Sequence, residues 1–82
     1  METVIRVVAR EDFHLELMFN TQETRLFDAR PYLSRGAFVR LQNPELFKQA
    51  YVACDTVCWP GELDIAPETL YDRSFALETC PP

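Results

Sequence analysis

The chain has 82 residues and a mass of 9.5 kDa, and its composition is 48% apolar and 12% aromatic. These values are typical of one small folded domain and exclude a disordered chain, a large enzyme, a doubly wound nucleotide-binding fold and a repeat array. No apolar run approaches the roughly 18 residues of a membrane helix, and the N-terminus lacks the basic start and apolar stretch of a secretory signal.

The net charge is −5 at pH 7, and the charge is unevenly distributed along the chain. Residues 1–42 hold six acids and six arginines, whereas residues 43–82 hold seven acids against Lys48 and Arg73. An acidic surface repels nucleic acid, because nucleic-acid binding depends mainly on neutralising phosphates. The charge therefore favours a basic protein partner over nucleic acid.

The cysteines are odd in number and are not accompanied by a secretory signal: Cys54, Cys58 and Cys80. This pattern favours free thiols in a reducing compartment over a disulfide framework. We therefore expect a cytoplasmic protein.

The first third of the chain predicts a three-stranded antiparallel meander over residues 4–9, 14–19 and 24–29. Residues 4–9 are apolar on most of both faces, as in a central strand, and residues 14–19 alternate between apolar and polar side chains. Turns of about four residues join the three strands, which is too short for a parallel crossover.

A strong helix signal follows at Asn43-Pro44-Glu45. Asparagine can cap a helix, proline suits its first position, and glutamate favours the positive end of the helix dipole. The predicted helix covers residues 44–50 and buries Leu46, Phe47 and Ala50.

Residues 51–53 and 56–59 predict a β-hairpin around Cys54-Asp55, a turn without the glycine that two-residue loops usually contain. A second short helix is predicted from Pro67 to about Arg73. Residues 74–82 are predicted to form a loose tail.

Together these elements predict a single α+β domain over residues 1–73: a three-stranded antiparallel meander followed by a short helix, a β-hairpin and a second short helix. Trp59 ends the second hairpin strand and is predicted to cover one end of the core. We favour this role over the alternative, that of an exposed anchor for a partner.

The candidate metal-binding or catalytic side chains are the three cysteines and the single histidine, His14. Structural zinc sites bring ligands in tight pairs such as Cys-x2-Cys, whereas Cys54 and Cys58 lie four residues apart and His14 is on a distant strand. A cysteine nucleophile needs a nearby base, and nothing in the sequence brings His14 to a thiol. We therefore expect no catalytic residue, no metal and no cofactor, with His14 a solvent-facing strand residue.

Four arginines recur every five residues, a spacing that matches neither helix nor strand: Arg25, Arg30, Arg35 and Arg40. A nucleic-acid surface would interleave aromatic residues on a basic face. We expect instead ion pairs with nearby acids such as Asp28 and Glu23, each contributing about 0–1 kcal/mol where exposed.

A series of short motifs runs from Val4 to Tyr71. They are the opening strands ending in Phe27-Asp28, then Pro31, Gly36-Ala37-Phe38 with Leu41, Asn43-Pro44-Glu45-Leu46-Phe47, Thr56-Val57-Cys58-Trp59-Pro60, Asp64, and Pro67-Glu68-Thr69-Leu70-Tyr71. Together they resemble a group of small bacterial proteins, the domain-of-unknown-function 2442 family. The chain departs from the family pattern at Gly61 and in the turn before Thr56, which lacks the usual glycine.

The resemblance implies a β-rich α+β unit, in some members followed by a helix-turn-helix segment that this chain is too short to hold. It also implies a neighbouring gene for another small protein, an arrangement similar to toxin–antitoxin pairs. No catalytic residues are carried over from the family.

We therefore expect a non-enzymatic protein-interaction module, in its specific form the acidic, antitoxin-like half of a two-protein bacterial system. The predicted partner-binding residues are four acids of the second half: Glu62, Asp64, Glu68 and Asp72. An edge strand of the meander can also pair with a second copy, so that a homodimer is a further expectation. The alternative is a regulatory DNA-binding fragment that lacks its helix-turn-helix part.

Overall fold

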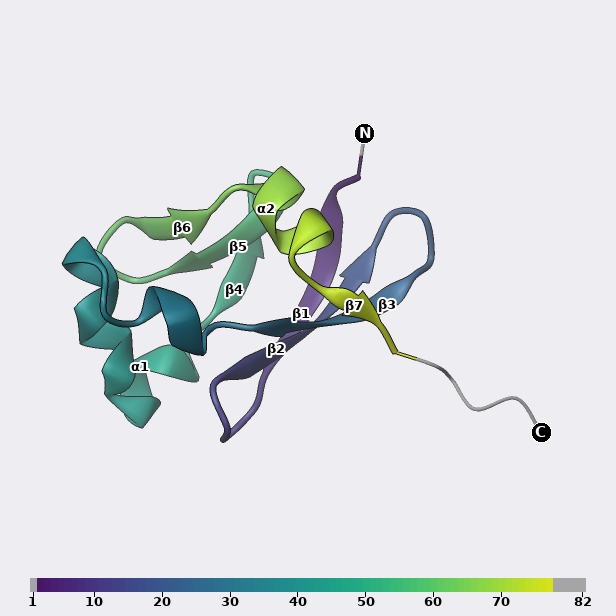
Figure 1. Ribbon diagram of the computed structural model, residues 1–82. Coiled ribbons are helices and arrows are strands. Elements are labelled where there is room, and N and C mark those ends of the chain that lie inside the picture. Colours follow the sequence, from purple (N-terminus) through teal and green to yellow (C-terminus); the bar gives the residue numbers. More distant parts are fainter. Residues whose placement is uncertain (1, 78–82) are drawn as a thin grey trace.

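A computed structural model describes residues 2–77, which form two small β-sheets connected and covered by short helical segments (Figure 1). The α+β class predicted from the sequence is confirmed. In chain order the elements are β1 (Val4–Ala9), β2 (His14–Phe19), β3 (Thr24–Asp28), the 3-10 helices η1 (Arg30–Tyr32) and η2 (Gly36–Gln42), α1 (Pro44–Phe47), β4 (Tyr51–Ala53), β5 (Thr56–Trp59), β6 (Leu63–Ile65), α2 (Pro67–Asp72) and β7 (Phe75–Ala76).

Both sheets are antiparallel. The first has the strand order β1-β2-β3-β7 and contains the predicted meander, and the second has the order β4-β5-β6. The sheets are joined along β1, which packs against β4 and β5. At this junction the backbone N–H of Val4 donates to the carbonyl oxygen of Asp55 at 2.9 Å.

The core lies where the inner faces of the two sheets meet α1 and α2. Its fully buried side chains include Leu15, Leu17 and Phe19 of β2, together with Leu70 of α2. Trp59 of β5 is also fully buried, as predicted. Alternation along β2 therefore sends one set of side chains into the core and leaves the other set on the opposite face of the sheet.

The central-strand prediction for residues 4–9 is wrong, because β1 lies at an edge of its sheet. Val4 pairs with Phe19 and Arg6 pairs with Met18, so that Ile5 is the extra residue of a β-bulge. The bulge shifts the inward–outward alternation by one residue. As a result Val4 is buried, whereas Ile5 remains 55% exposed.

Two strands were not predicted. β6 pairs with β5, Leu63 lying opposite Trp59, and this makes the predicted hairpin a three-stranded sheet. β7 pairs with β3, Phe75 lying opposite Leu26, so the prediction that the loose tail begins at Ser74 is wrong. The remainder of that predicted tail, residues 78–82, lies outside the described part of the chain.

The capping signal of the first helix is confirmed, because the side chain of Asn43 accepts the backbone N–H of Glu45 at 3.0 Å. α1 ends three residues before the predicted end, since the N–H groups of Gln49 and Ala50 bond to carbonyls only three residues back. Such bonds tighten the last turn of a helix. None of the helices formed by residues 2–77 has the length and apolar character required to cross a bilayer.

The turn between β4 and β5 adopts the geometry that normally calls for glycine. Cys54 and Asp55 have φ angles of 52° and 67°, as in a type I′ turn. Asp55→Gly removes about 1–2 kcal/mol of strain that a left-handed φ angle causes in a residue with a side chain. Glycine also gives the unfolded chain more conformational freedom, which lowers the stability by about 0.4–1 kcal/mol. We therefore expect it to stabilise the protein by about 0.5–1 kcal/mol.

Urea unfolding of wild type and Asp55→Gly measures this difference. Ser34→Gly serves as the control, because Ser34 is exposed and has no positive φ. The control has only the entropic cost and is expected to be destabilised. Equal unfolding midpoints for the two glycine variants would contradict the strain at Asp55.

Candidate functional site

One face of the sheet β1-β2-β3-β7 is turned away from the core. His14, Glu16 and Met18 of β2 point to this face and alternate with the buried side chains of the same strand. His14 was predicted to face solvent; its side chain does point away from the core, but it is only 14% exposed because Asp12 and Asp28 lie against it.

Strand pairing brings one residue from each of the four strands into a single row across this face. Val8 lies opposite Glu16, Glu16 opposite Leu26, and Leu26 opposite Phe75. Met18 lies in the neighbouring row, between Arg6 and Thr24. We name the apolar members of these two rows the outer apolar patch: Val8, Met18, Leu26 and Phe75.

The side chains of the outer apolar patch are substantially exposed to solvent. Val8 is 51% and Phe75 55% exposed, and Met18 and Leu26 are partly exposed. Beside them lies a hollow of about 210 Å³, lined by Arg6, Val8, Glu16, Leu17, Met18 and Thr24. This volume lies below the range of typical small-molecule pockets and suits one inserted side chain.

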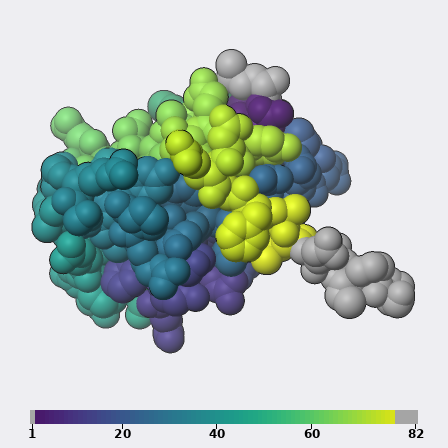
Figure 2. Space-filling view, in the orientation of Figure 1, coloured from purple at the N-terminus to yellow at the C-terminus, as the bar shows by residue number. Residues whose placement is uncertain are grey.

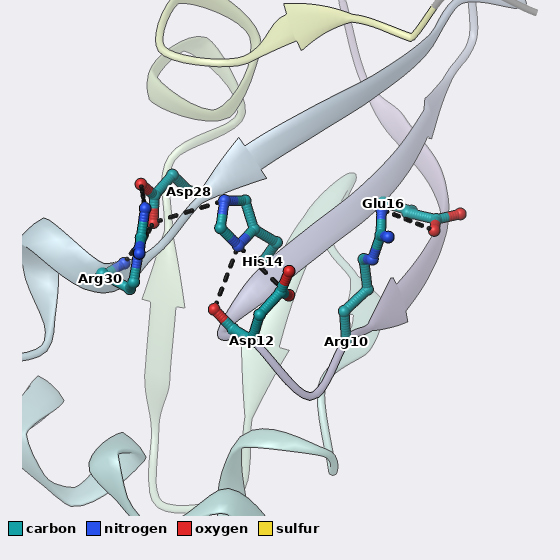
Figure 3. A network of polar contacts seen from close by, with 6 residues as sticks. All are labelled: Arg10, Asp12, His14, Glu16, Asp28 and Arg30. Carbon is teal, nitrogen blue, oxygen red and sulfur yellow. Dashed lines mark hydrogen bonds and ion pairs between the residues drawn. The ribbon is translucent and has the colours of Figure 1, made fainter.

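A network of polar contacts borders the patch at the end of the sheet where β1 meets β2 (Figure 3). Nδ1 of His14 lies 3.2 Å from a carboxylate oxygen of Asp12, and Nε2 lies 3.8 Å from a carboxylate oxygen of Asp28. Figure 3 shows His14 between these two acids, with Arg10 and Glu16 forming a separate pair at 3.2 Å.

Asp28 is the most strongly held acid of this network. The guanidinium of Arg30 donates to both of its carboxylate oxygens at 2.9 and 2.8 Å, and the backbone N–H of Arg30 donates at 3.0 Å. These hydrogen bonds from Arg30, with a smaller effect from nearby His14, lower the pKa of Asp28 from 3.8 to about 2. The carboxylate is therefore ionised at any physiological pH.

We expect Asp28→Asn to destabilise the protein above about pH 4 and to lose this effect in acid. A carboxyl whose pKa is lower in the folded state contributes stability above its unfolded pKa of 3.8, and that contribution is lost as pH falls through its folded pKa of about 2. Urea unfolding of both proteins over this pH range measures the difference. Arg30→Gln should raise the pKa of Asp28, read by the carbon-13 shift of its carboxyl group, and an unchanged titration would contradict the role of Arg30.

The four acids predicted to bind a partner are placed in two pairs. Glu62 and Asp64 line a hollow of about 220 Å³ with Tyr51, Cys58, Trp59 and Leu63. Glu68 and Asp72 lie one turn apart on α2, and all four acids are exposed. None of the four forms an ion pair within residues 2–77, so their charge is not neutralised there.

The predicted arginine pairs are confirmed for two of the four arginines, Arg25 with Glu23 and Arg30 with Asp28. Arg40 instead donates to the carbonyl oxygen of Gly61 at 3.3 Å. The fourth arginine, Arg35, lies over an aromatic ring rather than beside an acid.

The two described thiols, Cys54 and Cys58, make no contact with His14. Cys54 and Cys58 are free, and Cys80 lies outside the described residues. Burial, with a further effect of Asp64, raises the pKa of the Cys58 thiol and so makes it a weaker nucleophile at neutral pH. Among the described residues no group of three or more histidine, cysteine or acidic side chains is placed to hold a metal ion.

Sequence reasoning missed the outer apolar patch for two reasons. Val8 was assigned to a strand buried on both faces, and Phe75 was assigned to the loose tail. The bulge at Ile5 has no reliable local signature, since β-branched residues continue through it. The one available signal was Phe75 itself, a large apolar residue in a segment that was otherwise taken to be solvated.

Comparison with known proteins gives one match. The family model described as protein of unknown function (DUF2442) matches residues 4–76, nearly the whole chain. No curated protein and no solved structure matches. The resemblance inferred from the motifs is therefore confirmed, and the chain belongs to the DUF2442 family of proteins of unknown function.

Proposed function

We propose that this chain is a non-enzymatic protein-interaction module that binds a partner protein through the outer apolar patch. The observation that carries the proposal is the exposed row across the sheet, in which Val8 and Phe75 are each about half exposed beside the partly exposed Leu26. Apolar side chains gathered on one uncovered face are typical of interaction sites, whereas scattered ones are not.

The polar border supports a protein partner. Interfaces commonly combine an apolar centre with a polar rim. Here Glu16, which lies between Val8 and Leu26, is paired with Arg10, and at the border Asp28 is paired with Arg30. A partner can therefore cover the apolar centre without leaving one of these charges unpaired.

The charge of the chain supports a basic partner. The net charge is −5, and the acids Glu62, Asp64, Glu68 and Asp72 have no cationic side chain paired with them in the described region. Unpaired charge of one sign mainly accelerates association with a partner of the opposite sign. In its specific form, the proposal is that this chain is the acidic, antitoxin-like half of a two-protein bacterial system.

The chemistry of the described side chains supports a non-enzymatic role. His14 contacts the carboxylates of Asp12 and Asp28 rather than a thiol or hydroxyl that it could activate as a nucleophile. The Cys58 thiol has a raised pKa, which is the opposite of what an activated cysteine needs.

Two valines permit a matched test of the binding face. Val8 lies in the outer apolar patch and is 51% exposed, and Val39 lies on η2 and is 46% exposed. We expect Val8→Lys to reduce capture of the partner from a lysate by about tenfold or more, because a buried ammonium at an interface is costly, and Val39→Lys to leave capture unchanged. Lysine is well tolerated on an edge strand such as β1, and Val39 is about half exposed on η2, so that both variants should fold.

The outcomes separate the proposal from its alternatives. A protein captured by wild type and Val39→Lys but lost with Val8→Lys supports the proposal, and equal loss with both variants contradicts it. If the captured protein is a second copy of this chain, sedimentation will show a dimer, and this result contradicts the proposal of a basic partner. Salt-dependent binding to duplex DNA would favour the DNA-binding alternative.

A further inference from the structure

A second hollow lies away from the outer apolar patch, where η1 and the segment after it meet the end of α2. Its volume is about 300 Å³, and it is lined by Asp28, Pro31, Tyr32, Arg35 and Arg73. Figure 2 shows the same neighbourhood from outside, with the yellow C-terminal part of the described chain lying against the teal segment around residues 30–40. The hollow thus joins parts of the chain that are about forty residues apart.

Arg35 is held in place by a ring instead of an acid. Its guanidinium carbon lies 5.2 Å from the ring centre of Tyr32, and that ring stacks on the buried Phe27 with centroids 5.4 Å apart. A guanidinium over an aromatic ring keeps its N–H groups free for a second ligand while losing mobility. Arg35 is therefore positioned but not neutralised.

Arg73 caps the C-terminal end of α2 and forms no ion pair within residues 2–77. Asp28, the acid in the lining, has its charge balanced by Arg30 through two short hydrogen bonds. The hollow therefore presents two unbalanced positive charges, from Arg35 and Arg73, in a chain whose net charge is −5.

We propose that this hollow binds a phosphate group, which Arg35 and Arg73 hold from two sides. Guanidinium groups match phosphate oxygens with paired, charge-assisted hydrogen bonds, and two of them balance the double charge of a phosphate dianion. Asp28, the acid in the lining, is paired with Arg30, and this pairing reduces its repulsion of the ligand. This site is independent of the outer apolar patch and of the proposed protein partner.

The test is a titration of the folded protein with inorganic phosphate at constant ionic strength, followed by amide and arginine Nε shifts in proton–nitrogen spectra. We expect saturable shifts clustered at Tyr32, Arg35 and Arg73. Arg35→Gln and Arg73→Gln should each weaken the affinity about tenfold, and both side chains are exposed, so the fold should be kept. Lys48→Gln removes the same charge from an exposed position outside the hollow and should leave the affinity unchanged.

Three outcomes would overturn the site. Shifts that rise linearly without a plateau would show an adventitious ion only. Equal weakening by Lys48→Gln and Arg35→Gln would show that net charge alone attracts the anion. Acetate binding as tightly as phosphate would remove the assignment to a phosphate group, because a single carboxylate balances only one of the two guanidinium charges.

Discussion

Trp59→Ala is expected to remove a large fraction of the free energy of unfolding. The indole is fully buried, stacks on Phe47 with ring centroids 5.8 Å apart, and donates its N–H to the carbonyl oxygen of Phe47 at 3.0 Å. Truncating such a side chain costs about 3–5 kcal/mol. A domain of 82 residues has a total stability of about 4–12 kcal/mol, so the loss is a large fraction of the whole.

Circular dichroism in urea measures this loss, because the variant lacks the only tryptophan and its fluorescence signal. Trp59→Phe separates packing from hydrogen bonding: it keeps an aromatic ring but removes the indole donor, so that the Phe47 carbonyl keeps only the N–H of Ala50, at a cost of about 0.5–1.5 kcal/mol. Tyr51→Ala is the control, since Tyr51 is 48% exposed on the neighbouring strand, and it should change stability by about 0.5 kcal/mol or less. Equal losses for Trp59→Ala and Tyr51→Ala would contradict a core role of Trp59.

The stacking of Trp59 on Phe47 also shows which parts of the fold the sequence can predict. Trp59 was assigned to the core because a large apolar residue ends a strand, and this local inference is correct. The residue that its ring stacks on and its N–H binds is Phe47 of α1, which lies twelve residues earlier in the chain and was not predicted as its neighbour. Burial follows from local chemistry, but the identity of a neighbour depends on how two sheets pack.

The two strands that were not predicted, β6 and β7, show the same limit of local sequence patterns. β7 has two residues and β6 has three, and each pairs with a neighbouring strand. So short a segment carries too few residues for an alternating pattern to be recognised. Strand pairing, across a tight turn for β6 and with a distant segment for β7, therefore forms elements that local patterns do not predict.

The two proposed sites were beyond prediction for a related reason. The outer apolar patch combines residues of four strands in one register, which a bulge of one residue would shift. The phosphate site combines Arg35 and Arg73, which only the folded chain brings together. The predicted acids, by contrast, are exposed because charged residues near a turn and on a short helix almost always are.

Arg25→Ala is expected to release β7 and destabilise the protein by about 2–4 kcal/mol, because Arg25 attaches β7 and α2 to the first sheet. Its side chain is only 15% exposed and donates to the hydroxyl and carbonyl oxygens of Ser74, both at 2.7 Å. Its guanidinium carbon lies 4.4 Å from the ring centre of Tyr71, and the Tyr71 hydroxyl donates to Glu23 at 2.7 Å. That bond lowers the pKa of Glu23 and raises that of Tyr71, so both groups keep the protonation states that the bond requires at neutral pH.

Arg30→Ala is the matched control, because it removes an arginine whose side chain also donates two short hydrogen bonds but is 62% exposed, and it should cost at most about 1 kcal/mol. Hydrogen exchange locates the effect: the amide of Leu77, which donates to Thr24 at 2.9 Å, should lose protection in Arg25→Ala and keep it in Arg30→Ala. Because β7 carries Phe75 of the outer apolar patch, the same variant should also weaken capture of the partner. Unchanged exchange at Leu77 would show that strand pairing alone holds β7, and binding would then depend on the patch without any contribution from Arg25.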